Sequence, residues 1–430
     1  MDNMRGLSAG DLPAHGLRFN KDRVQSPAGL MTTSHTCDIV VVGAGIFGIT
    51  AAIELAGRGH EVCVIDPGPL PHPLAASTDI SKVVRMEYGS SRDYMAMGEA
   101  ARAGWLEWND EFASELYHET GVLMMSQTAM EPGGFERDSF DLLRRRGHQP
   151  ERLDGAEITR RFPAWRPGAF GDGFYHRLGG YAESGRTVVA LVDKARRVGV
   201  GLYPGHTAER LLGDDGQVTG VSTRERAIFS ADTVVVAAGA WTPLLLPELH
   251  SLMRISGHPI VHLELADPSR FSAPDFPVFT ADIARTGWYG FPVHPAAGVV
   301  KIANHGVGVP VHPSRDERVV SAADIAALRA FLSDALPALA DAPIAYTRRC
   351  LYCDTADGHF VIARHPHRDG LCVASGGSGH GFKFAPVLGS LIADAAEGQS
   401  NPDLTRFRWR TIEAVSGPVS DERDAARYQG

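Results

Sequence analysis

The alternation of apolar and polar positions is clearest near the start of the chain, where it predicts a strand, a helix and a second strand. Residues 39–42 (IVVV) form an unbroken β-branched run, which is typical of a strand buried on both faces. Residues 49–58 have helical spacing and end at Gly59. A second apolar run, residues 61–65, is closed by Asp66. This order of elements is typical of a nucleotide-binding β-α-β unit.

The rest of the chain contains both helical and strand-like spacing of apolar residues, and its composition changes in the middle. Between Met253 and Asp341 the sequence is rich in Pro, Gly and aromatic residues, and its short apolar runs predict short strands. The other predicted elements are helices over residues 92–116, 185–200, 322–339 and from the 378–384 stretch to 396, with strands over 201–211, from Asp232, and over 370–377.

We therefore expect an α/β (α+β) protein with a Rossmann-like nucleotide-binding domain assembled from discontinuous segments. A substrate domain, built on a mostly antiparallel sheet, is inserted between those segments. The expected nucleotide-binding segments are 37–117, 183–246 and 347–409, the substrate segments are 118–182 and 247–346, and the expected tails are 1–36 and 410–430.

Composition narrows the class of protein. The 430 residues are 44% hydrophobic and 22% charged, which suits a globular protein with a sizeable core. The formal net charge of −9 argues against a nucleic-acid or anionic-membrane surface. No apolar run approaches the roughly 20 residues of a membrane-spanning helix, and the first residues lack the apolar core of a secretory signal. Five scattered cysteines indicate no disulfide framework, so we expect a cytoplasmic protein. We also expect a monomer or a small homo-oligomer.

The turn between the first predicted strand and helix carries the strongest local motif. Gly43, Gly45 and Gly48 form G-x-G-x-x-G. The first glycine makes a tight turn, the second lets the backbone approach a pyrophosphate, and the third lets helix and strand pack closely. Asp66 stands where an acidic residue bonds ribose hydroxyls. Although G-x-G-x-x-G alone is also an ordinary glycine turn, this context predicts dinucleotide binding, without distinguishing FAD from NAD.

Two cysteines, Cys350 and Cys353, are spaced C-x-x-C in the stretch YTRRCLYCDT. This spacing is compatible with half a metal site, a redox couple or a different function. A four-ligand zinc site needs a second pair, and a redox C-x-x-C usually opens a helix beside a thioredoxin-like unit. Neither context is present nearby, so we predict no metal site.

The chain resembles monomeric sarcosine oxidase and its relatives, which are FAD-dependent amine oxidases with a D-amino-acid-oxidase-like fold. The relatives include N-methyltryptophan oxidase, pipecolate oxidase and the fructosyl amino acid oxidases. The resemblance covers roughly Cys37 to Arg410 and rests on VVVGAGIFG, VVRMEYG, GAW, YGFP, KIANH, CLYCDTADGHF and SGHGFKF, in the family's order. Several motifs in one order are far more specific than any single motif.

The resemblance implies a function for one cysteine. In the family a cysteine forms a thioether to the 8α-methyl of FAD, nine residues before the histidine of an H-F pair. Counting back from His359, which precedes Phe360, gives Cys350, whereas Cys353 falls on a non-cysteine position. Because the thiolate is the reactive form, Arg348 and Arg349 would assist if they point inward.

Family motifs also imply catalytic residues. Lys301 matches the lysine that activates oxygen near the flavin, and His305 matches a histidine on the substrate side. By composition alone, a snorkelling lysine at a strand edge would be favoured for Lys301, and the alternative for His305 is a core histidine with its hydrogen bonds satisfied. Arg85 and Lys383 match the two cations that hold the substrate carboxylate, although each in isolation reads as surface charge.

Two tyrosines, Tyr289 and Tyr352, match residues that line the family's substrate pocket, or else are core aromatics. The residues that the resemblance places on the cofactor are Gly43, Gly45, Ile46, Phe47, Gly48, Asp66, Ser81, Lys82, Ala208, Ala238, Gly239, Trp241, Cys350, Gly379, His380, Gly381, Phe382 and Lys383. Residues 379–382 should bring backbone N–H groups and a helix N-terminus to the flavin.

The substrate loop departs from the sarcosine and pipecolate oxidases. Their His/Gly-rich loop ends in arginine, whereas this chain has ASTDISK (residues 76–82), with Lys82 in place of the arginine near the flavin. The sequence DISK is closer to the D-[IL]-N-K of fructosyl amino acid oxidases. Lys82 is therefore a further catalytic candidate, and the identity of the amine stays open.

We expect an FAD-dependent oxidase of a small secondary amine, most simply an N-methyl or cyclic amino acid. The product is an imine, and oxygen is reduced to hydrogen peroxide. The alternatives are a fructosyl amino acid oxidase, a dehydrogenase that uses another electron acceptor, and a non-catalytic dinucleotide-binding protein. The last alternative would need no Cys350, Lys301, Arg85 or Lys383.

Overall fold

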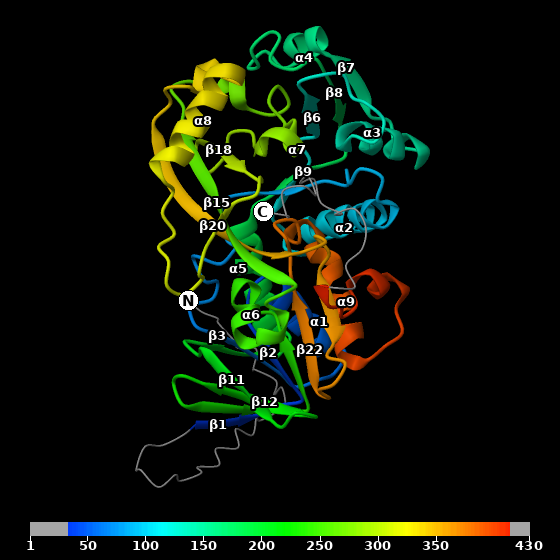
Figure 1. Ribbon diagram of the computed structural model, residues 1–430, viewed down its shortest axis with the longest axis vertical. Helices are drawn as coiled ribbons and strands as arrows, with labels where there is room; N and C mark the ends of the chain where they lie inside the picture. Colours follow the sequence, from blue (N-terminus) through cyan, green and yellow to red (C-terminus); the bar gives the residue numbers. More distant parts are fainter. Residues whose placement is uncertain (1–32, 413–430) are drawn as a thin grey trace, which may run out of the picture.

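The computed structural model describes residues 33–412 and contains two large sheets, one in each half of Figure 1. The sheet in the lower half has six strands, all parallel except the last. Its order is β10 (Gly201–Pro204), β3 (Val62–Asp66), β2 (Ile39–Val42), β14 (Thr233–Val236), β22 (Leu371–Ser375) and β21 (Val361–Arg364).

Each face of this sheet is covered by a different layer. Alternate side chains of the strands, such as Val41 and Val64, pack with helices α1 (Ile46–Gly57), α2 (Arg92–Glu111), α5 (Ser184–Arg197) and α9 (Ala385–Glu397). The opposite set, such as Val40 and Ile65, packs on a four-stranded sheet. That sheet contains β1 (Thr33–Thr36), β13 (Ala227–Ser230), β12 (Val218–Thr223) and β11 (Ala208–Gly213). Burial on both faces explains the unbroken apolar run of β2.

The second large sheet has nine strands and is antiparallel except between β16 and β6. Its strands are β19 (Val309–Pro310), β15 (Met253–Glu264), β18 (Val299–Asn304), β17 (Trp288–Gly290), β16 (Val278–Ala281), β6 (Val122–Ser126), β8 (Asp172–His176), β7 (Glu151–Asp154) and β20 (Ile344–Thr355). Helices α3 (Phe135–Arg145), α4 (Gly155–Arg161), α7 (Ile283–Thr286) and α8 (Ala322–Ala335) accompany it. The predicted fold class is thus confirmed.

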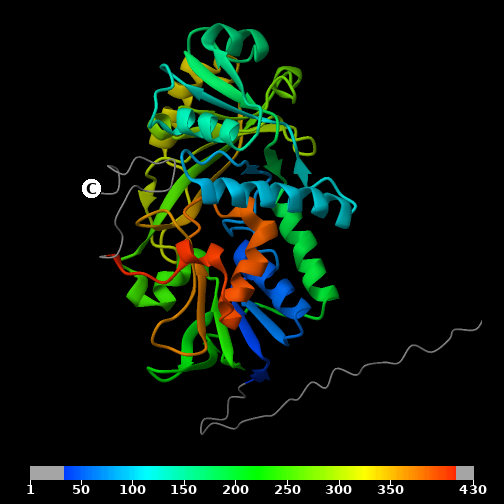
Figure 2. The ribbon, with the colours of Figure 1, turned by 90° about the vertical axis from the view of Figure 1, so that its right-hand side faces the viewer.

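Two long strands join the two halves. Strands β15 and β20 pair along most of their length and run from the nine-stranded sheet down to the six-stranded sheet (Figure 1). Helix α2 crosses between the halves in the view of Figure 2. The structure also has a small sheet of β4 (Lys82–Val84), β9 (Gly180–Ala182) and β5 (Tyr117–His118), and a short helix, α6 (Thr242–Leu245). Within residues 33–412, none of the helices is long and apolar enough to cross a membrane.

Several element boundaries differ from the sequence predictions. The helix predicted over 92–116 ends at Glu111, because Asn109 Oδ1 accepts hydrogen bonds from the backbone of Leu116 and Tyr117 at 2.8 and 2.9 Å. The strand predicted over 201–211 is two strands, β10 and β11, separated by a turn at Gly205 with φ +77°.

Parts of both segments that were expected to be tails belong to the packed structure. Residues 33–36 of the expected N-terminal tail form β1, which pairs with β13, while 1–32 lie outside the described residues. At the other end, Arg410 bonds Asp357 at 2.6 Å, so it belongs to the packed part, and 413–430 lie outside the described residues. Residues 347–355, expected among the nucleotide-binding segments, are part of β20 in the nine-stranded sheet.

Candidate active site

The G-x-G-x-x-G turn follows β2, and its geometry requires glycine at two of its three positions. Gly43 has φ +102°, and a Cβ there would lie 2.6 Å from the carbonyl oxygen of Ala237. A Cβ on Gly48 would lie 1.9 Å from the carbonyl oxygen of Gly43. A Cβ on Gly45 would meet only Ser77 Oγ, at 3.4 Å. Gly45 is therefore not required by packing, which fits its predicted exposure to a pyrophosphate.

Polar side chains hold this turn in place. The buried Asp66 accepts hydrogen bonds from the backbone N–H of Ala44 at 2.9 Å and of Gly68 at 3.1 Å. Ser77 Oγ accepts from the N–H of Ile46 at 2.9 Å. The N–H of Ile46, at the start of α1, is therefore engaged by a side chain.

The parallel strands bring the other nucleotide-type segments to the same edge. Strands β2, β3, β14 and β22 run in one direction, so Gly43, Asp66, Ala238 and Gly376 all follow their carboxyl ends. Ligands of open α/β sheets bind in the crevice at this edge. Gly239 begins a 3₁₀ turn with φ +52°. The residues present therefore fit a dinucleotide.

Two further predicted cofactor residues lie on neighbouring elements, the 3₁₀ turn after β14 and strand β11. Trp241 is 37% exposed, and its Nε1 donates to Ser314 Oγ at 2.8 Å. Ala208 begins β11 of the four-stranded sheet, opposite Thr223.

A second glycine-rich turn, residues 376–381, follows β22. Gly376 and Gly379 have φ of +72° and +74°, which favours glycine. The Phe47 ring of α1 lies against this turn, since a Cβ on Gly381 would be 2.7 Å from it. The two turns are thus packed together through one predicted cofactor residue.

The backbone of this second turn differs from the prediction in two ways. The N–H groups of His380 and Gly381 both donate to the carbonyl oxygen of Gly377, at 2.8 and 3.0 Å, so they are engaged within the turn. The helix expected to open at this motif is preceded by a 3₁₀ turn, Phe382–Phe384, and α9 begins at Ala385.

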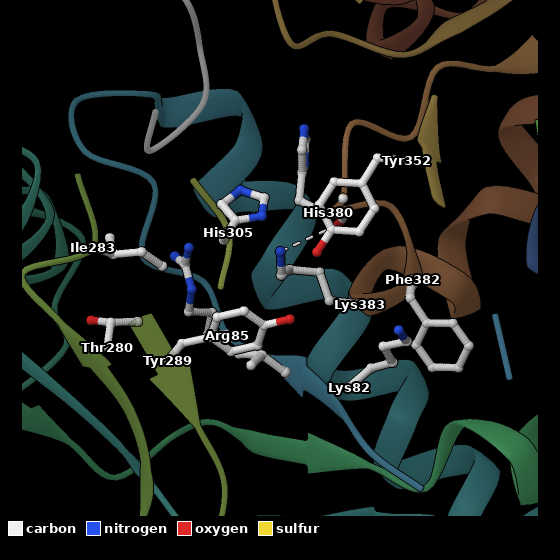
Figure 3. A pocket seen from close by; sticks show the side chains of 12 residues that line it. Lys82, Arg85, Thr280, Ile283, Tyr289, His305, Tyr352, His380, Phe382 and Lys383 are labelled. Carbon is white, nitrogen blue, oxygen red and sulfur yellow. Dashed lines mark hydrogen bonds between the residues drawn. The ribbon is translucent and has the colours of Figure 1, made fainter. Parts of the chain in front are cut away.

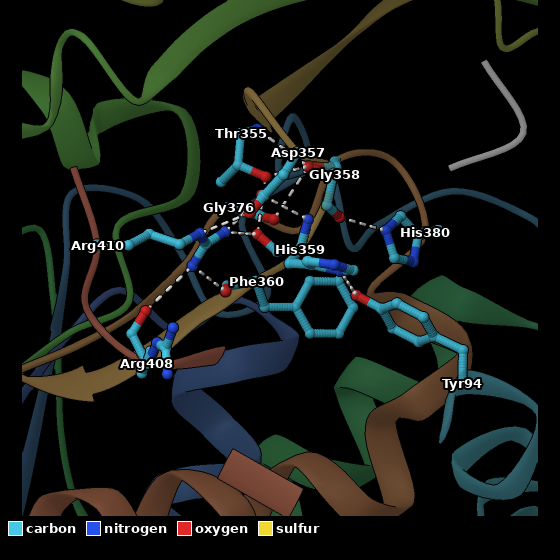
Figure 4. Close-up of polar contacts among 11 residues, drawn as sticks. Tyr94, Thr355, Asp357, Gly358, His359, Phe360, Gly376, His380, Arg408 and Arg410 are labelled. Carbon is cyan, nitrogen blue, oxygen red and sulfur yellow. Dashed lines mark hydrogen bonds and ion pairs between the residues drawn. The ribbon is translucent and has the colours of Figure 1, made fainter. Parts of the chain in front are cut away.

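Polar contacts fix the second turn to the loop between β20 and β21 (Figure 4). His380 Nε2 lies 2.9 Å from the carbonyl oxygen of Gly358, and Nδ1 lies 3.1 Å from the Tyr88 hydroxyl. Arg410 binds the Asp357 carboxylate with two nitrogens and donates to the carbonyl of His359 at 2.7 Å. This loop and the second turn therefore have a defined relative position.

A pocket lies beside the second turn and collects most of the predicted catalytic residues (Figure 3). Its lining comes from β4 and the segment after it, from β16, α7, β17 and the residue after β18, from β20, and from the second turn with the 3₁₀ turn that follows it. The lining residues are Lys82, Val83, Arg85, Thr280, Ile283, Tyr289, His305, Tyr352, Gly379, His380, Phe382 and Lys383. These segments are far apart in the sequence, so the fold assembles the pocket.

Two cations of this pocket, Arg85 and Lys383, are buried. They are 4% and 6% exposed, and Figure 3 shows their charged ends directed toward the part of the pocket near His305. Lys383 Nζ donates to the Tyr88 hydroxyl at 2.8 Å, and the Arg85 guanidinium lies 5.2 Å from the centre of the Tyr88 ring. Buried cations at a pocket favour an anionic ligand, because a carboxylate there would accept charge-assisted hydrogen bonds from them.

Aromatic side chains form the rest of the lining. The Tyr352 ring stacks on His258 with centroids 3.9 Å apart and lies against Gly379, where a Cβ would be 2.3 Å from it. The ring of Tyr289 lies 6.4 Å from that of His305. Burial raises the pKa of the Tyr289 hydroxyl, so this group stays neutral and can donate a hydrogen bond.

Lys301 lies behind the pocket lining and forms a buried ion pair. Its Nζ is 2.5 Å from Asp79 Oδ2 and donates to the carbonyl oxygen of Ser81. Burial lowers the pKa of Lys301 to about 8, although Asp79 raises it and Lys82 lowers it further. Burial opposes ionisation of Asp79, but Lys301 and His262 hold the pKa of that carboxyl well below its usual value. The site thus contains a lysine that loses its positive charge as the pH rises through its pKa of about 8.

The two C-x-x-C cysteines point to opposite sides of β20. Cys350 packs with Ile260, Ala303 and Tyr352, next to the pocket. Cys353 packs in the core under the six-stranded sheet, where burial raises the pKa of its thiol to about 12. Residues three apart on a strand face opposite ways, so the pair is not one binding site. No cluster of potential metal ligands occurs among residues 33–412.

The two arginines before the cysteines are buried, and their hydrogen bonds go to backbone carbonyl groups and to Asp324. Arg348 donates to the carbonyl of Pro73 at 2.9 Å and also to that of Thr78, so it fixes the loop that leads to Lys82. Arg349 binds Asp324 and the carbonyl of Val319.

Three features of this site were not predicted from the sequence. Asp79 stands in the DISK stretch, but a partner for Lys301 is invisible until the strands are placed. Tyr88 follows Arg85 in VVRMEYG, and its position in that motif was the available signal. Thr280 and Ile283 carry no motif, and only the pairing of β16 with β17 brings them to the pocket.

Comparison with known proteins agrees with this arrangement. The family described as FAD dependent oxidoreductase (DAO) matches residues 38–395, a range that includes both glycine-rich turns. L-saccharopine oxidase of Schizosaccharomyces pombe is 30% identical, over 88% of this chain and 94% of that protein. Monomeric sarcosine oxidase of a Bacillus species is 27% identical, over 86% of this chain and 95% of that protein.

A solved structure also has a similar fold. Fructosamine oxidase from Aspergillus fumigatus (Amadoriase II), in complex with FSA, superimposes with a TM-score of 0.78 and 25% identity, over 91% of this chain and 93% of that chain. The chain therefore belongs to the FAD dependent oxidoreductase (DAO) family.

Proposed function

We propose that this protein is an FAD-dependent oxidase of secondary amines that carry a carboxylate, most simply N-alkyl amino acids. Oxidation of the C–N bond gives an imine, and oxygen is the electron acceptor, with hydrogen peroxide as the product. The relatives named sarcosine oxidase and saccharopine oxidase support this class of reaction.

The observation that carries the proposal is the pair of buried cations in one pocket. Arg85 and Lys383 both line it, and neither is at the surface. A carboxylate placed between them would receive charge-assisted hydrogen bonds. The amine of such a substrate would then lie toward Tyr352 and His305, in the aromatic part of the pocket.

FAD, when bound, supplies the two-electron acceptor for the amine and returns the electrons to oxygen. The first glycine-rich turn would hold its pyrophosphate, and the second turn with Lys82 would adjoin its ring system. Lys301 holds a positive charge behind Ser81 and Lys82, where it would stabilise negative charge that develops on oxygen. Tyr88 orients Lys383 through the 2.8 Å hydrogen bond.

The direct test is a panel of amines supplied to the FAD-loaded protein, with oxygen consumption and peroxide formation as readouts. We expect turnover of N-alkyl amino acids and little turnover of the same amines without the carboxylate. Bleaching of the flavin by substrate without oxygen uptake would instead identify a dehydrogenase. Absence of both signals would exclude the proposed reaction.

We also propose that Cys350 anchors FAD through a thioether. Its position beside Tyr352, on the pocket side of β20, supports this function. Acid denaturation of the purified protein should leave the yellow colour on the polypeptide, and Cys350→Ala should release it. The matched control is Cys353→Ala, which changes the opposite face of the same strand and should keep the flavin bound.

A fructosyl amino acid is a second candidate substrate. The DISK stretch and the similarity to fructosamine oxidase favour it. A fructosyl amino acid in the same panel decides between the two candidates, because both carry a carboxylate and only one carries the sugar.

A further inference from the structure

Three side chains form a row across neighbouring strands of the nine-stranded sheet, on the face that also carries Cys350 and Tyr352. His262 of β15 pairs with Lys301 of β18 on one side and with Tyr346 of β20 on the other. The three strands are labelled in the upper half of Figure 1. Residues directly opposite each other in a sheet point to the same face and lie within contact distance. His262 therefore lies between Lys301 and Tyr346.

Burial increases along this row. Tyr346 is 44% exposed, whereas the side chains of His262 and Lys301 are 8% and 1% exposed. The centres of the His262 and Tyr346 rings lie 5.0 Å apart, so the His262 ring is next to a surface residue. The row therefore leads from the surface of the molecule to the buried lysine.

Asp79 lies over the row and links His262 to Lys301. Its Oδ1 is 3.2 Å from His262 Nε2, and its Oδ2 is 2.5 Å from Lys301 Nζ. The backbone of Asp79 is fixed by the start of α5, where Ser184 Oγ and the N–H of Gly185 donate to its carbonyl oxygen at 2.9 and 2.8 Å. The three side chains thus form a continuous polar chain in which the two carboxylate oxygens face different partners.

Within residues 33–412, the other charges that act on Lys301 offer no comparable connection to solvent. These charges are Lys82 and Arg348. An arginine does not release its proton in proteins, and Arg348 donates to backbone carbonyl groups. Lys82 lines the pocket, where a bound ligand would exclude water. Asp79 and His262 are therefore the titratable groups that connect Lys301 with the surface.

The proposed reaction needs a proton where oxygen is reduced. Oxidation of a secondary amine to an imine releases two electrons and two protons, and reduction of oxygen to hydrogen peroxide takes up the same number. The cofactor carries both electrons and one proton, so the second proton comes from solvent or from a protein group. Because burial lowers the pKa of Lys301 to about 8, this lysine can release a proton near neutral pH and regain it. Histidine commonly carries protons between solvent and such a group.

We propose that His262 and Asp79 form a proton path that connects the buried Lys301 with solvent beside Tyr346. Lys301 gives a proton to the reduced oxygen, and a proton from solvent replaces it through the His262 ring and the Asp79 carboxylate. The N–H bond broken at Lys301 is remade at the end of this transfer, so the residues return to their initial charges. This inference rests on the proposed function in taking oxygen as the electron acceptor, and it adds the route of the proton.

The first test needs no turnover. In FAD-loaded protein with isotope-labelled lysine, NMR measures the exchange of the Lys301 ammonium protons with water, and Lys301→Met identifies the signal. His262→Gln keeps an amide that can donate to Asp79 but cannot pass a proton on. We expect exchange to be slower in His262→Gln than in the wild type by about tenfold or more. Equal exchange rates would overturn the inference.

The second test follows the reaction of the reduced holoenzyme with oxygen, after reduction of the flavin by light so that no amine is required. His262→Gln should slow this step by about tenfold or more. His262→Ala should also be slow and should recover several-fold when imidazole is added, because imidazole can occupy the vacated ring position and transfer protons. A residue that only positions Asp79 would be replaced adequately by glutamine. An unchanged rate in His262→Gln, or no response of His262→Ala to imidazole, therefore counts against the path.

His294→Gln is the matched control. His294 is also a buried histidine near a buried carboxylate, since its Nε2 lies 3.7 Å from Glu183, but it is not part of the row. This variant should leave both the exchange of the Lys301 protons and the oxygen reaction unchanged. Equal effects of His294→Gln and His262→Gln would show a general disturbance of the site and would overturn the path.

The outcomes separate this inference from the proposed function. If no amine reduces the flavin but exchange at Lys301 depends on His262, the proposed reaction is wrong and the path stands. Turnover of amines with exchange and oxygen reaction independent of His262 supports the proposed reaction and overturns the path. If one of the two His262 variants does not fold, the other decides, because proton exchange at Lys301 is measured in the same way in both.

Discussion

The carboxyl edge of the six-stranded sheet and the pocket beside it are built in different ways. The motif at the edge comes from one continuous stretch, in which Gly43 and Gly48 lie close to the backbone of Ala237 and of Gly43, and Asp66 accepts a hydrogen bond from the N–H of Ala44. The pocket uses side chains from segments hundreds of positions apart, such as Arg85, Thr280 and Lys383. A local sequence motif is therefore enough to predict the first region, whereas the arrangement of the second region is visible only in the folded structure.

The largest expected effect is the loss of FAD binding in two glycine variants of the first glycine-rich turn. One variant should also destabilise the apoprotein, whereas the other should not. Gly48→Ala places a Cβ 1.9 Å from the Gly43 carbonyl, so we expect it to destabilise the apoprotein by about 1–3 kcal/mol and to abolish FAD binding. Gly45→Ala meets nothing closer than 3.4 Å. It should leave the apoprotein Tm within about 2 °C of wild type and still lose FAD.

Apoprotein Tm and flavin content per polypeptide distinguish the two variants. Full FAD occupancy in Gly45→Ala would show that the cofactor does not approach the backbone there.

The next effect concerns Lys301, behind the pocket. Lys301→Met removes the buried charge, and we expect the reaction of reduced enzyme with oxygen to slow by about 10²–10³-fold. Reduction of the flavin by substrate should change only a few-fold. Stopped-flow measurement of the two half-reactions checks this, and Lys82→Met provides the comparison. A larger loss of the oxygen reaction rate in Lys82→Met than in Lys301→Met would show that Lys82 is the main residue for the reaction with oxygen.

A smaller effect is expected for the carboxylate site. Arg85→Gln and Lys383→Met each remove a charged hydrogen bond, so kcat/KM for a carboxylate substrate should fall by about 10–100-fold. The same amine without its carboxylate should be affected little. If both compounds lose equal activity, the two residues do not bind the carboxylate.

The smallest effect is a shift in pH dependence. Lys301 is charged below its pKa of about 8, so the oxygen reaction should slow as pH rises through that value. Asp79 raises the pKa of Lys301, so Asp79→Asn should move the fall to lower pH and cause a several-fold loss near pH 7.5. A pH profile of the oxygen half-reaction that is unchanged in Asp79→Asn would contradict this coupling.

The sequence allowed the class of fold, the nucleotide turn and the residue types of the pocket to be predicted. The β-α-β unit could be predicted because its signals are local: β-branched residues at 39–42, glycine at Gly43 and Gly48, and an acid at Asp66. Six predicted catalytic residues line one pocket, but their identification came from family motifs, since isolated cations such as Arg85 carry no signal.

The features that could not be predicted depend on contacts between distant segments. Asn109 ends α2 through a side-chain hydrogen bond, and Gly205 divides one apolar run into two strands of different sheets. The partner of Lys301 is separated from it by more than two hundred residues. Thr280 has ordinary sequence surroundings, and only the structure shows that its buried hydroxyl lacks a hydrogen-bond partner within residues 33–412.

Strand β20 contributes to both regions at once. Cys350 and Tyr352 face the pocket side, whereas Cys353, three residues after Cys350, faces the core beneath the six-stranded sheet. Alternate positions of one strand are therefore under separate constraints. New amine preferences can arise by replacing pocket-facing residues such as Tyr352, while inward-facing positions such as Cys353 preserve the packing beneath the six-stranded sheet. The fold is suited to diversification of substrate on a fixed redox chemistry.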